Sequence, residues 1–404
     1  MIKRLFTSLA RSNWGHRVAP DVEQRIRLSV ERDRRGLPSV DPGSQQAIAA
    51  AVSWLCRAQD CSASADGGVA RAYSLRSGWS ASYPETTGYI IPTIIDCATA
   101  SNNEELRARA RRMLSWLRSI QMPCGGFQGG KIDSVPIVPV VFNTGQILIG
   151  LAAGEKAFGG HRDPLLRAAD WLVSIQDRDG CWRTFPSPFA MQGDRTYDTH
   201  TAWGLLEAAR IEPARGYAEA ALRNVRWALG HQHNNGWMDK CCLSDWTQPL
   251  THTLGYALRG MLEAFRYSQD EQFLIAAQKT ADGLMAARGA DGFLPGTLRQ
   301  DWSSAAEWAC LTGTVQIAYC WFTLYQIRGD VRYREAALAA NHYVRRTISL
   351  SEQPDIRGGV QGSFPIDGDY GKYEYPNWAA KFLIDSLMLE CAVLDQTAFA
   401  KPRP

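Results

Sequence analysis

The sequence has no long hydrophobic run, little net charge and no regular cysteine pattern. None of its apolar stretches approaches the roughly eighteen residues that a membrane-spanning helix needs, which predicts a soluble protein. The formal net charge is +3 over 404 residues, too small for the basic surface of a nucleic-acid-binding protein. The ten cysteines follow no framework spacing and no secretory signal precedes them, so we expect reduced thiols and a cytoplasmic location.

The sequence also lacks segments in which polar and apolar residues alternate strongly enough to predict a β-strand. Helical spacing is present instead. Apolar residues recur at i, i+3, i+4 and i+7, for example at Leu165, Ala168, Ala169 and Leu172. With 45% apolar residues, the chain has enough of them for a large helical core.

A short polar cluster precedes an apolar helical run at six places, separated by about 53 to 65 residues. Asp, Asn and Thr favour helix N-termini, so each cluster predicts the start of a helix. The clusters are Glu85-Thr86-Thr87-Gly88, Asn143-Thr144-Gly145-Gln146, Asp198-Thr199-His200-Thr201, Thr251-His252-Thr253, Thr312-Gly313-Thr314 and Asn377-Trp378-Ala379.

A second set of helical segments lies between these runs. Four of them lead to a glutamine (Gln59, Gln121, Gln176, Gln232) and all six to a loop rich in glycine and aromatic residues. Glycine permits the left-handed backbone that ends a helix. Repeats of this length need their neighbours to cover their apolar faces. The sequence therefore predicts an all-α fold, a single (α/α)6 toroid of six helical hairpins over residues 44–400, after an N-terminal extension over residues 1–43.

The segment Gln176-Asp177-Arg178-Asp179-Gly180-Cys181-Trp182, which recurs with variation, resembles the repeats of α/α-toroid proteins. That superfamily includes terpenoid cyclases, protein prenyltransferase β subunits, and six-hairpin glycosidases with related epimerases and lyases. The segments at residues 83–89 and 359–364 are similar to those of uncharacterised six-hairpin proteins associated with bacterial polysaccharide clusters. The resemblance covers roughly residues 44–395 and implies a carbohydrate-active enzyme acting on a bacterial polysaccharide or its lipid-linked precursor.

Six polar helix starts in a ring would surround one pocket, and the glycine–aromatic loops would form its rim. Glycoside cleavage requires two carboxyl groups, one protonated and one ionised. Helix N-termini favour ionised Glu85 and Asp198, which suits a base or a nucleophile, although Asp198 alone also fits an N-cap. Crowding of Asp367, Asp369 and Glu374 would raise a pKa and supply the acid. The residues predicted to bind the sugar, by stacking or by hydrogen bonds, are Trp79, Tyr83, Asn143, Gln146, Trp182, Trp237, Trp302, Tyr373, Trp378 and Lys381.

His200 and His252 occupy matching positions in successive repeats. As general bases they suit a uronate lyase or epimerase, although a histidine bonded to a neighbouring threonine or backbone group explains them equally well. In the lyase or epimerase hypothesis, Lys381 or Arg195 would neutralise the uronate carboxylate, and one of Tyr370, Tyr373 and Tyr375 would return the proton.

Two alternatives remain open. Prenyltransferases of the toroid group hold zinc through Asp, Cys and His, a set that Asp239 and Cys241, or Asp179 and Cys181, would imitate with His200 or His252. A non-catalytic glycan-binding toroid is the other. We expect no cofactor, and the sequence says little about oligomeric state. The N-terminal residues Ile2, Leu5, Phe6 and Leu9 form a candidate segment for weak membrane-surface contact, or a basic leader that packs locally.

Overall fold

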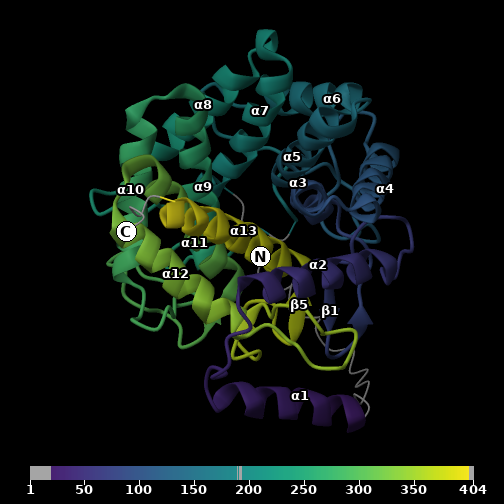
Figure 1. Ribbon diagram of the computed structural model, residues 1–404. Coiled ribbons are helices and arrows are strands. Elements are labelled where there is room, and N and C mark those ends of the chain that lie inside the picture. Colours follow the sequence, from purple (N-terminus) through teal and green to yellow (C-terminus); the bar gives the residue numbers. More distant parts are fainter. Residues whose placement is uncertain (1–19, 189, 191–192, 400–404) are drawn as a thin grey trace, which may run out of the picture.

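Twelve helices form two concentric rings in the computed structural model, which describes residues 20–188, 190 and 193–399 (Figure 1). The inner helices are α3 (Pro84–Ser101), α5 (Val141–Phe158), α7 (Thr199–Ile211), α9 (Thr251–Ser268), α11 (Leu311–Arg328) and α13 (Asn377–Phe399). The outer helices are α2 (Ser44–Asp60), α4 (Glu104–Ile120), α6 (Arg162–Ser174), α8 (Tyr217–Leu229), α10 (Glu271–Ala286) and α12 (Val331–Arg345). The predicted all-α toroid is confirmed.

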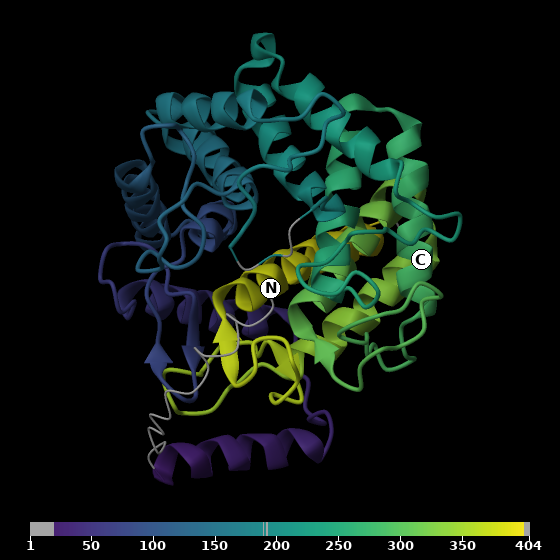
Figure 2. The same cartoon turned by 180° about the vertical axis from the view of Figure 1, so that it is seen from behind.

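Each inner helix packs against the outer helix that follows it in the chain, as α3 does with α4. Inner helix α13 packs instead on α2, the first outer helix, which closes the ring (Figure 2). The outer-to-inner connections are long, and they gather at the end of the ring where the inner helices begin. Short 3-10 helices lie at Thr196–Asp198 (η1) and Pro213–Arg215 (η2).

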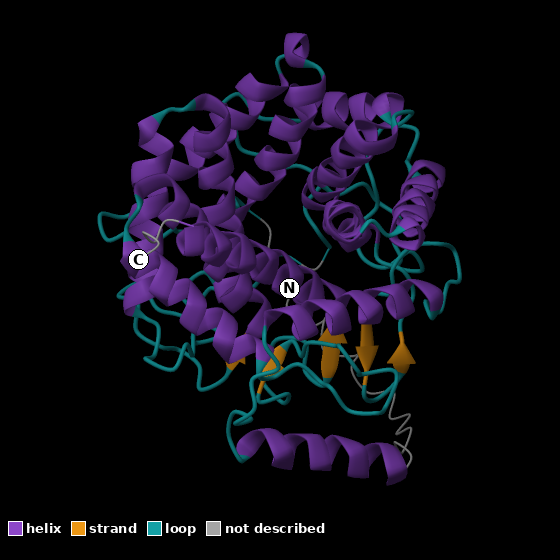
Figure 3. Cartoon of the chain, viewed as in Figure 1, coloured by secondary structure: helices purple, strands orange, loops and turns teal. Residues whose placement is uncertain are grey.

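Five short strands lie in these long connections, on one side of the ring (Figure 3). A three-stranded antiparallel sheet has the order β2-β1-β5, and β3 pairs with β4. The strands are β1 (Ala72–Ser74), β2 (Gly78–Trp79), β3 (Ala309–Cys310), β4 (Ser363–Phe364) and β5 (Glu374–Pro376). Strands of two or three residues leave no alternating pattern, which is why the sequence did not predict them.

The repeated glutamines join neighbouring outer helices. Gln121 Nε2 donates to the carbonyl of Gly125 in its own loop, at 2.9 Å, and to that of Pro164 in the next outer helix, at 2.8 Å. Gln176 makes the same two bonds one repeat later, to Gly180 and Ala220. These half-buried amide groups fix each loop against the following hairpin.

The threonines of the polar clusters bind the same loops. The hydroxyl of Thr87 accepts from the backbone N–H of Val69, and that of Thr144 accepts from the N–H of Phe127. Both threonine side chains are completely buried. These hydroxyl groups therefore anchor each loop to the inner helix that it precedes.

Loop glycines allow the backbone of one repeat to touch the next, which gives a prediction about stability. Gly125 has φ +96°, and a Cβ atom there would lie 2.3 Å from the carbonyl oxygen of Arg167. Gly159 also has positive φ, +71°, but a Cβ there would meet nothing within 4 Å. We expect Gly125→Ala to cost about 1–3 kcal/mol more than Gly159→Ala in urea unfolding, because only the first adds overpacking to the backbone strain. Equal losses would show that the close approach is unimportant.

Helix α1 (Pro20–Arg34), in the segment proposed as an N-terminal extension, lies outside the ring beyond the small sheet (Figure 1). Its Asp33 is buried and accepts a 3.0 Å hydrogen bond from the backbone N–H of Ile366. Arg34 pairs with Asp367 at 2.7 Å. Helix α1 thus holds the loop before β5 from behind.

Among the described helices, none combines the length and the apolar character that crossing a bilayer requires. The N-terminal residues proposed for membrane-surface contact lie outside the described residues.

Candidate active site

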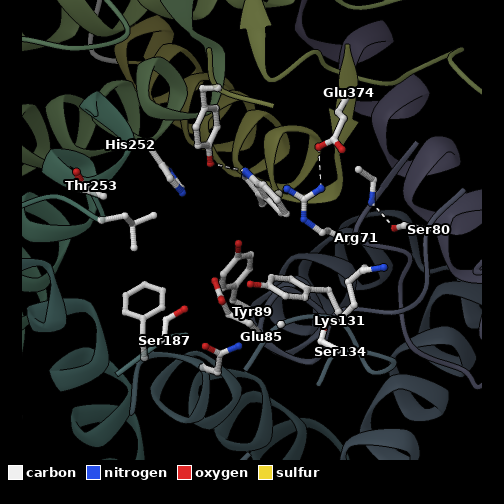
Figure 4. A pocket seen from close by; sticks show the side chains of 18 of the residues that line it. Arg71, Ser80, Glu85, Tyr89, Lys131, Ser134, Ser187, His252, Thr253 and Glu374 are labelled. Atoms are coloured by element: carbon white, nitrogen blue, oxygen red, sulfur yellow. Dashed lines mark hydrogen bonds and ion pairs between the residues drawn. The ribbon is translucent and has the colours of Figure 1, made fainter. Parts of the chain in front are cut away.

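A cavity of about 530 Å³ opens at the end of the toroid where the inner helices begin (Figure 4). Four inner helices contribute to its wall, and the rest comes from the sheet and the long loops. The residues from α3, α5, α9 and α13 are Glu85, Tyr89, Phe142, Asn143, His252, Thr253, Tyr256 and Trp378. The sheet and loops add Arg71, Ala72, Ser74, Tyr83, Lys131, Ser134, Tyr197, Tyr370 and Glu374. A volume of this size suits a small-molecule ligand.

Glu85 lies in the first turn of α3, directly after Pro84, and is only 8% exposed. Burial raises its pKa to about 7, against the smaller opposing effects of the Tyr83 hydroxyl and Arg71. The sequence suggested that the helix N-terminus would favour the ionised form. Desolvation outweighs that effect here, so a large fraction of Glu85 is protonated at neutral pH.

Glu374, from β5, lies across the cavity in a different environment (Figure 4). Its carboxylate pairs with Arg71 at 2.7 Å. The guanidinium of Arg71 also lies over the Trp378 ring, 5.1 Å from the centroid. One cavity thus holds a buried carboxyl group and a carboxyl group paired with an arginine.

The expected crowding of carboxylates near β5 does not occur. Asp367 pairs with Arg34 at the back of the loop. Asp369 is 81% exposed, lies 3.9 Å from Lys372 and does not line the cavity. Each carboxylate thus has its own cationic partner, and of the three only Glu374 lines the cavity.

His252, in the first turn of α9, points into the cavity (Figure 4). Its Nδ1 lies 2.6 Å from Oε1 of Gln316 on α11. The ring packs against Tyr256 and Tyr370, with centroids 4.4 Å and 5.3 Å away. Burial lowers the pKa of His252 to about 4, so its ring is neutral at physiological pH.

Four other predicted residues lie outside the cavity wall. Asp198 is buried against Arg195, with a 3.2 Å ion pair, and makes no cap hydrogen bond to α7. His200 and Gln146 are hydrogen-bonded to each other, Nδ1 to Oε1 at 2.6 Å, and neither lines the cavity. Lys381 is 3% exposed and lines a separate cavity of about 410 Å³, formed by residues from further along the inner helices.

Among the predicted sugar-binding residues, Tyr83, Asn143 and Trp378 line the cavity. Trp182 is fully buried and donates its indole N–H to a backbone carbonyl. Trp237 packs edge-on against Trp302, and both hold loops together.

Two more of these aromatic residues support the cavity from outside its wall. Trp79 packs between Trp54 and Tyr73 behind the sheet. Tyr373 adopts φ +62° and lies beneath the guanidinium of Arg76. Neither side chain lines the cavity.

Several cavity residues were missed from the sequence. Tyr89 and Tyr256 lie four residues after Glu85 and His252, so they share a helix face with them, and that spacing could have identified them. Arg71 and Lys131 come from irregular loops and carry no comparable signal.

No three His, Cys, Asp or Glu side chains come together in the described part of the chain in a way that could hold a metal ion. The set suggested by the zinc alternative is not assembled there. Cys241 is buried and its thiol donates to the carbonyl of Thr253, whereas Asp239 bonds to His233.

The fold and site define a helical toroid with a cavity at the inner-helix N-termini, lined mainly by aromatic side chains with a few charged groups among them. Residues 84–258 match the family described as the squalene–hopene cyclase C-terminal domain. A squalene–hopene cyclase of Bradyrhizobium diazoefficiens is 28% identical over 134 residues, which are 31% of this chain and 19% of that protein. The match therefore spans about a fifth of the curated relative.

Solved structures of similar fold cover nearly the whole toroid. An unsaturated glucuronyl hydrolase specific for heparin has a TM-score of 0.70 at 15% identity, over 87% of this chain and 98% of that chain. A cellobiose 2-epimerase from Bacillus thermoamylovorans gives 0.67 at 11%, over 90% and 99%. A GH76 α-mannanase from Bacteroides thetaiotaomicron gives 0.64 at 15%, over 88% and 97%. The predicted resemblance to α/α-toroid proteins is confirmed at the level of the fold.

Proposed function

We propose that this protein is a carbohydrate-active enzyme that hydrolyses a glycosidic bond, with Glu85 as the general acid. One observation carries the proposal: a single cavity holds a buried carboxyl group with a pKa of about 7 and an ion-paired carboxylate. Two carboxyl groups in contrasting environments, one desolvated and one ion-paired, are typical of acid–base catalysis. A pKa near the working pH makes Glu85 an efficient proton donor.

The lining of the cavity supports a hydroxylated ligand. Tyr83, Asn143 and Tyr370 supply hydroxyl and amide groups, and Trp378 supplies an aromatic face. Aromatic rings with a few well-placed polar groups fit a sugar ring, which has an apolar face and polar edges. The solved structures of similar fold named above include glycan-processing enzymes, which agrees with this proposal.

A second candidate is elimination or epimerisation at a uronic acid, with His252 removing the proton beside the carboxylate. The observation that favours it is the neutral His252 ring in the same cavity as Arg71. Arg71 would neutralise the carboxylate, the role that the sequence gave to Lys381 or Arg195. We rank this candidate second because the buried Glu85 carboxyl group, with a pKa of about 7, supports an acid in hydrolysis.

The alternative suggested by the resemblance to prenyltransferases and terpenoid cyclases is an enzyme that acts on an isoprenoid. It is supported by the cyclase family match over residues 84–258. The largely aromatic lining of the cavity is compatible with an isoprenoid substrate. Arg71, Lys131, Glu85 and Glu374 lie among these aromatic rings. We rank isoprenoid chemistry below the carbohydrate proposal because these four charged groups suit a hydroxylated substrate better than a hydrocarbon chain.

A panel of substrates tests these proposals together. The purified protein is incubated with 4-methylumbelliferyl glycosides, uronate-containing oligosaccharides and farnesyl diphosphate, and products are analysed by mass spectrometry. We expect hydrolysis of a glycoside, strongly reduced in Glu85→Gln and retained in Glu390→Gln, a variant of a buried glutamate outside the cavity. An unsaturated sugar product would support elimination. Turnover of the diphosphate alone would overturn the carbohydrate assignment.

A further inference from the structure

Two histidines and two glutamines form a symmetrical row around one tyrosine. His252 bonds to Gln316, and His200 bonds to Gln146, each through Nδ1 and Oε1 at 2.6 Å. Tyr256 lies between the two imidazole rings, with centroids 4.4 Å from His252 and 4.5 Å from His200. Each histidine is in the first turn of its helix, and each glutamine is the sixth residue of its own.

The glutamine oxygen fixes the tautomer of each ring. An amide oxygen can only accept a hydrogen bond, so the Nδ1 that lies against it must carry the proton. In a neutral ring, Nε2 then keeps a free electron pair. The bond to the glutamine therefore decides which nitrogen can accept a proton, as partners of this kind do for other histidines.

The two halves of the row differ in what they reach. His252 lines the cavity and points into its open space (Figure 4). His200 is 1% exposed and packs among Phe142, Trp203 and Tyr256, outside the cavity wall. The same histidine–glutamine pair thus exposes Nε2 of His252 to a ligand in the cavity but keeps Nε2 of His200 in the core.

We propose that His252 is the base of the hydrolysis and that Gln316 is its positioning residue, holding the proton on Nδ1 so that Nε2 faces the attacking water. This inference rests on the proposed function, in which Glu85 is the acid. His252 Nε2 takes a proton from water as the water oxygen bonds to the anomeric carbon. Glu85 gives its proton to the leaving oxygen as the glycosidic bond breaks, leaving an imidazolium and a carboxylate that exchange protons with solvent.

The alternative base in the cavity is Glu374. Its carboxylate is already engaged by Arg71 at 2.7 Å, so that oxygen is occupied by the guanidinium and is not free to contact a water. The His252 ring has a pKa of about 4, so its basicity is that of an ordinary carboxylate. Within the described residues, no cationic group is paired with its Nε2.

Other groups also face His252 and would influence its titration. They are Tyr256 on its own helix, Tyr370 on the loop before β5, His200 beyond Tyr256, Cys310 at the start of α11 and Glu85 on α3. None of them is hydrogen-bonded to Nδ1 in the described structure, so a change at Gln316 acts on that atom directly.

Replacing each glutamine by glutamate gives a matched pair of variants. In Gln316→Glu a carboxylate faces the Nδ1 proton and stabilises the imidazolium, so the acid limb of the pH–kcat/KM profile should move up by about 1–3 pH units. Gln146→Glu places the same charge against His200, and the acid limb should stay where it is in the wild type. Gln316→Met, which has no oxygen acceptor, should lower kcat more than it changes KM.

Nuclear magnetic resonance of ¹⁵N-histidine-labelled protein tests the Gln316→Glu and Gln146→Glu variants without any substrate. His252, assigned by the signal lost in His252→Asn, should show the Nδ1–H tautomer and a pKa that rises in Gln316→Glu but not in Gln146→Glu. The Nε2–H tautomer, or an acid limb that moves equally in both variants or in neither, would overturn the inference. A raised His252 pKa with an unmoved acid limb would remove His252 as base while leaving Glu85, and the proposed function, intact.

Discussion

Replacing Glu85 by glutamine is expected to lower kcat by about 10²–10⁴-fold, the usual contribution of a positioned general acid. Glutamine keeps the size of the side chain and its hydrogen-bonding capacity, but it cannot release a proton. The basic limb of the wild-type kcat/KM profile should have its midpoint at about 7, the pKa of Glu85, and it should disappear from the residual activity of the variant. Stopped assays between pH 4 and pH 9 would measure both effects.

The same substitution should make the protein more stable at alkaline pH. The folded pKa of Glu85, about 7, lies above its ordinary value of 4.5, so the folded state holds this proton more tightly than the unfolded chain. The associated stability is fully present below pH 4.5 and is lost as the pH rises to 7. Glutamine has no such loss, and Glu85→Gln should gain up to about 3 kcal/mol over the wild type above pH 7.

A matched control separates the acid from a merely buried glutamate. Glu390 is 3% exposed and pairs with Arg345 outside the cavity. Glu390→Gln should keep the wild-type pH profile and should not become more stable at alkaline pH. A Glu85→Gln enzyme with normal turnover, or one whose stability follows the wild type at every pH, would mean that Glu85 is neither the acid nor a desolvated carboxyl group.

The architecture was predictable because it is repeated. The polar clusters mark the starts of the inner helices, which begin at residues 84, 141, 199, 251, 311 and 377. The expected role of these clusters as N-caps is not found at α5 and α9. Their N-cap residues are Val140 and Leu250, which make no side-chain cap hydrogen bond. The threonines one turn later bind loops instead, because the buried loop backbone needs partners that no strand or helix supplies.

The site was predictable only in part because a cluster fixes where a helix begins but not how it is rotated. His200 and His252 hold matching positions in the repeat, yet only His252 lines the cavity. The difference follows from their partners, since Gln146 lies on the helix before His200 and Gln316 on the helix after His252. Arg71 was beyond sequence reasoning, because its position depends on a loop whose path is set by contacts with β5.

Asp198 leads to the second large prediction, because its burial and its ion pair with Arg195 favour a structural role where the sequence suggested catalysis. Its carboxylate is 1% exposed and pairs with Arg195, whose side chain is 3% exposed. The guanidinium also donates to the carbonyls of Trp182 and Gly193. Asp198→Ala is expected to destabilise the fold by about 3–5 kcal/mol, because it leaves an uncompensated charge in the interior. Urea unfolding would measure the loss.

The double variant Asp198→Ala with Arg195→Met separates the charge from the packing. Methionine fills part of the space of arginine and carries no charge, so the double variant should recover stability relative to Asp198→Ala alone. Turnover of the single variant, assayed well below its unfolding temperature, should stay close to the wild type because Asp198 does not line the cavity. Lost turnover with unchanged stability would contradict the structural role of Asp198. Asp198 would then be one of the catalytic groups. The cavity that holds Glu85 and His252 would in that case extend further toward α7 than its lining residues indicate.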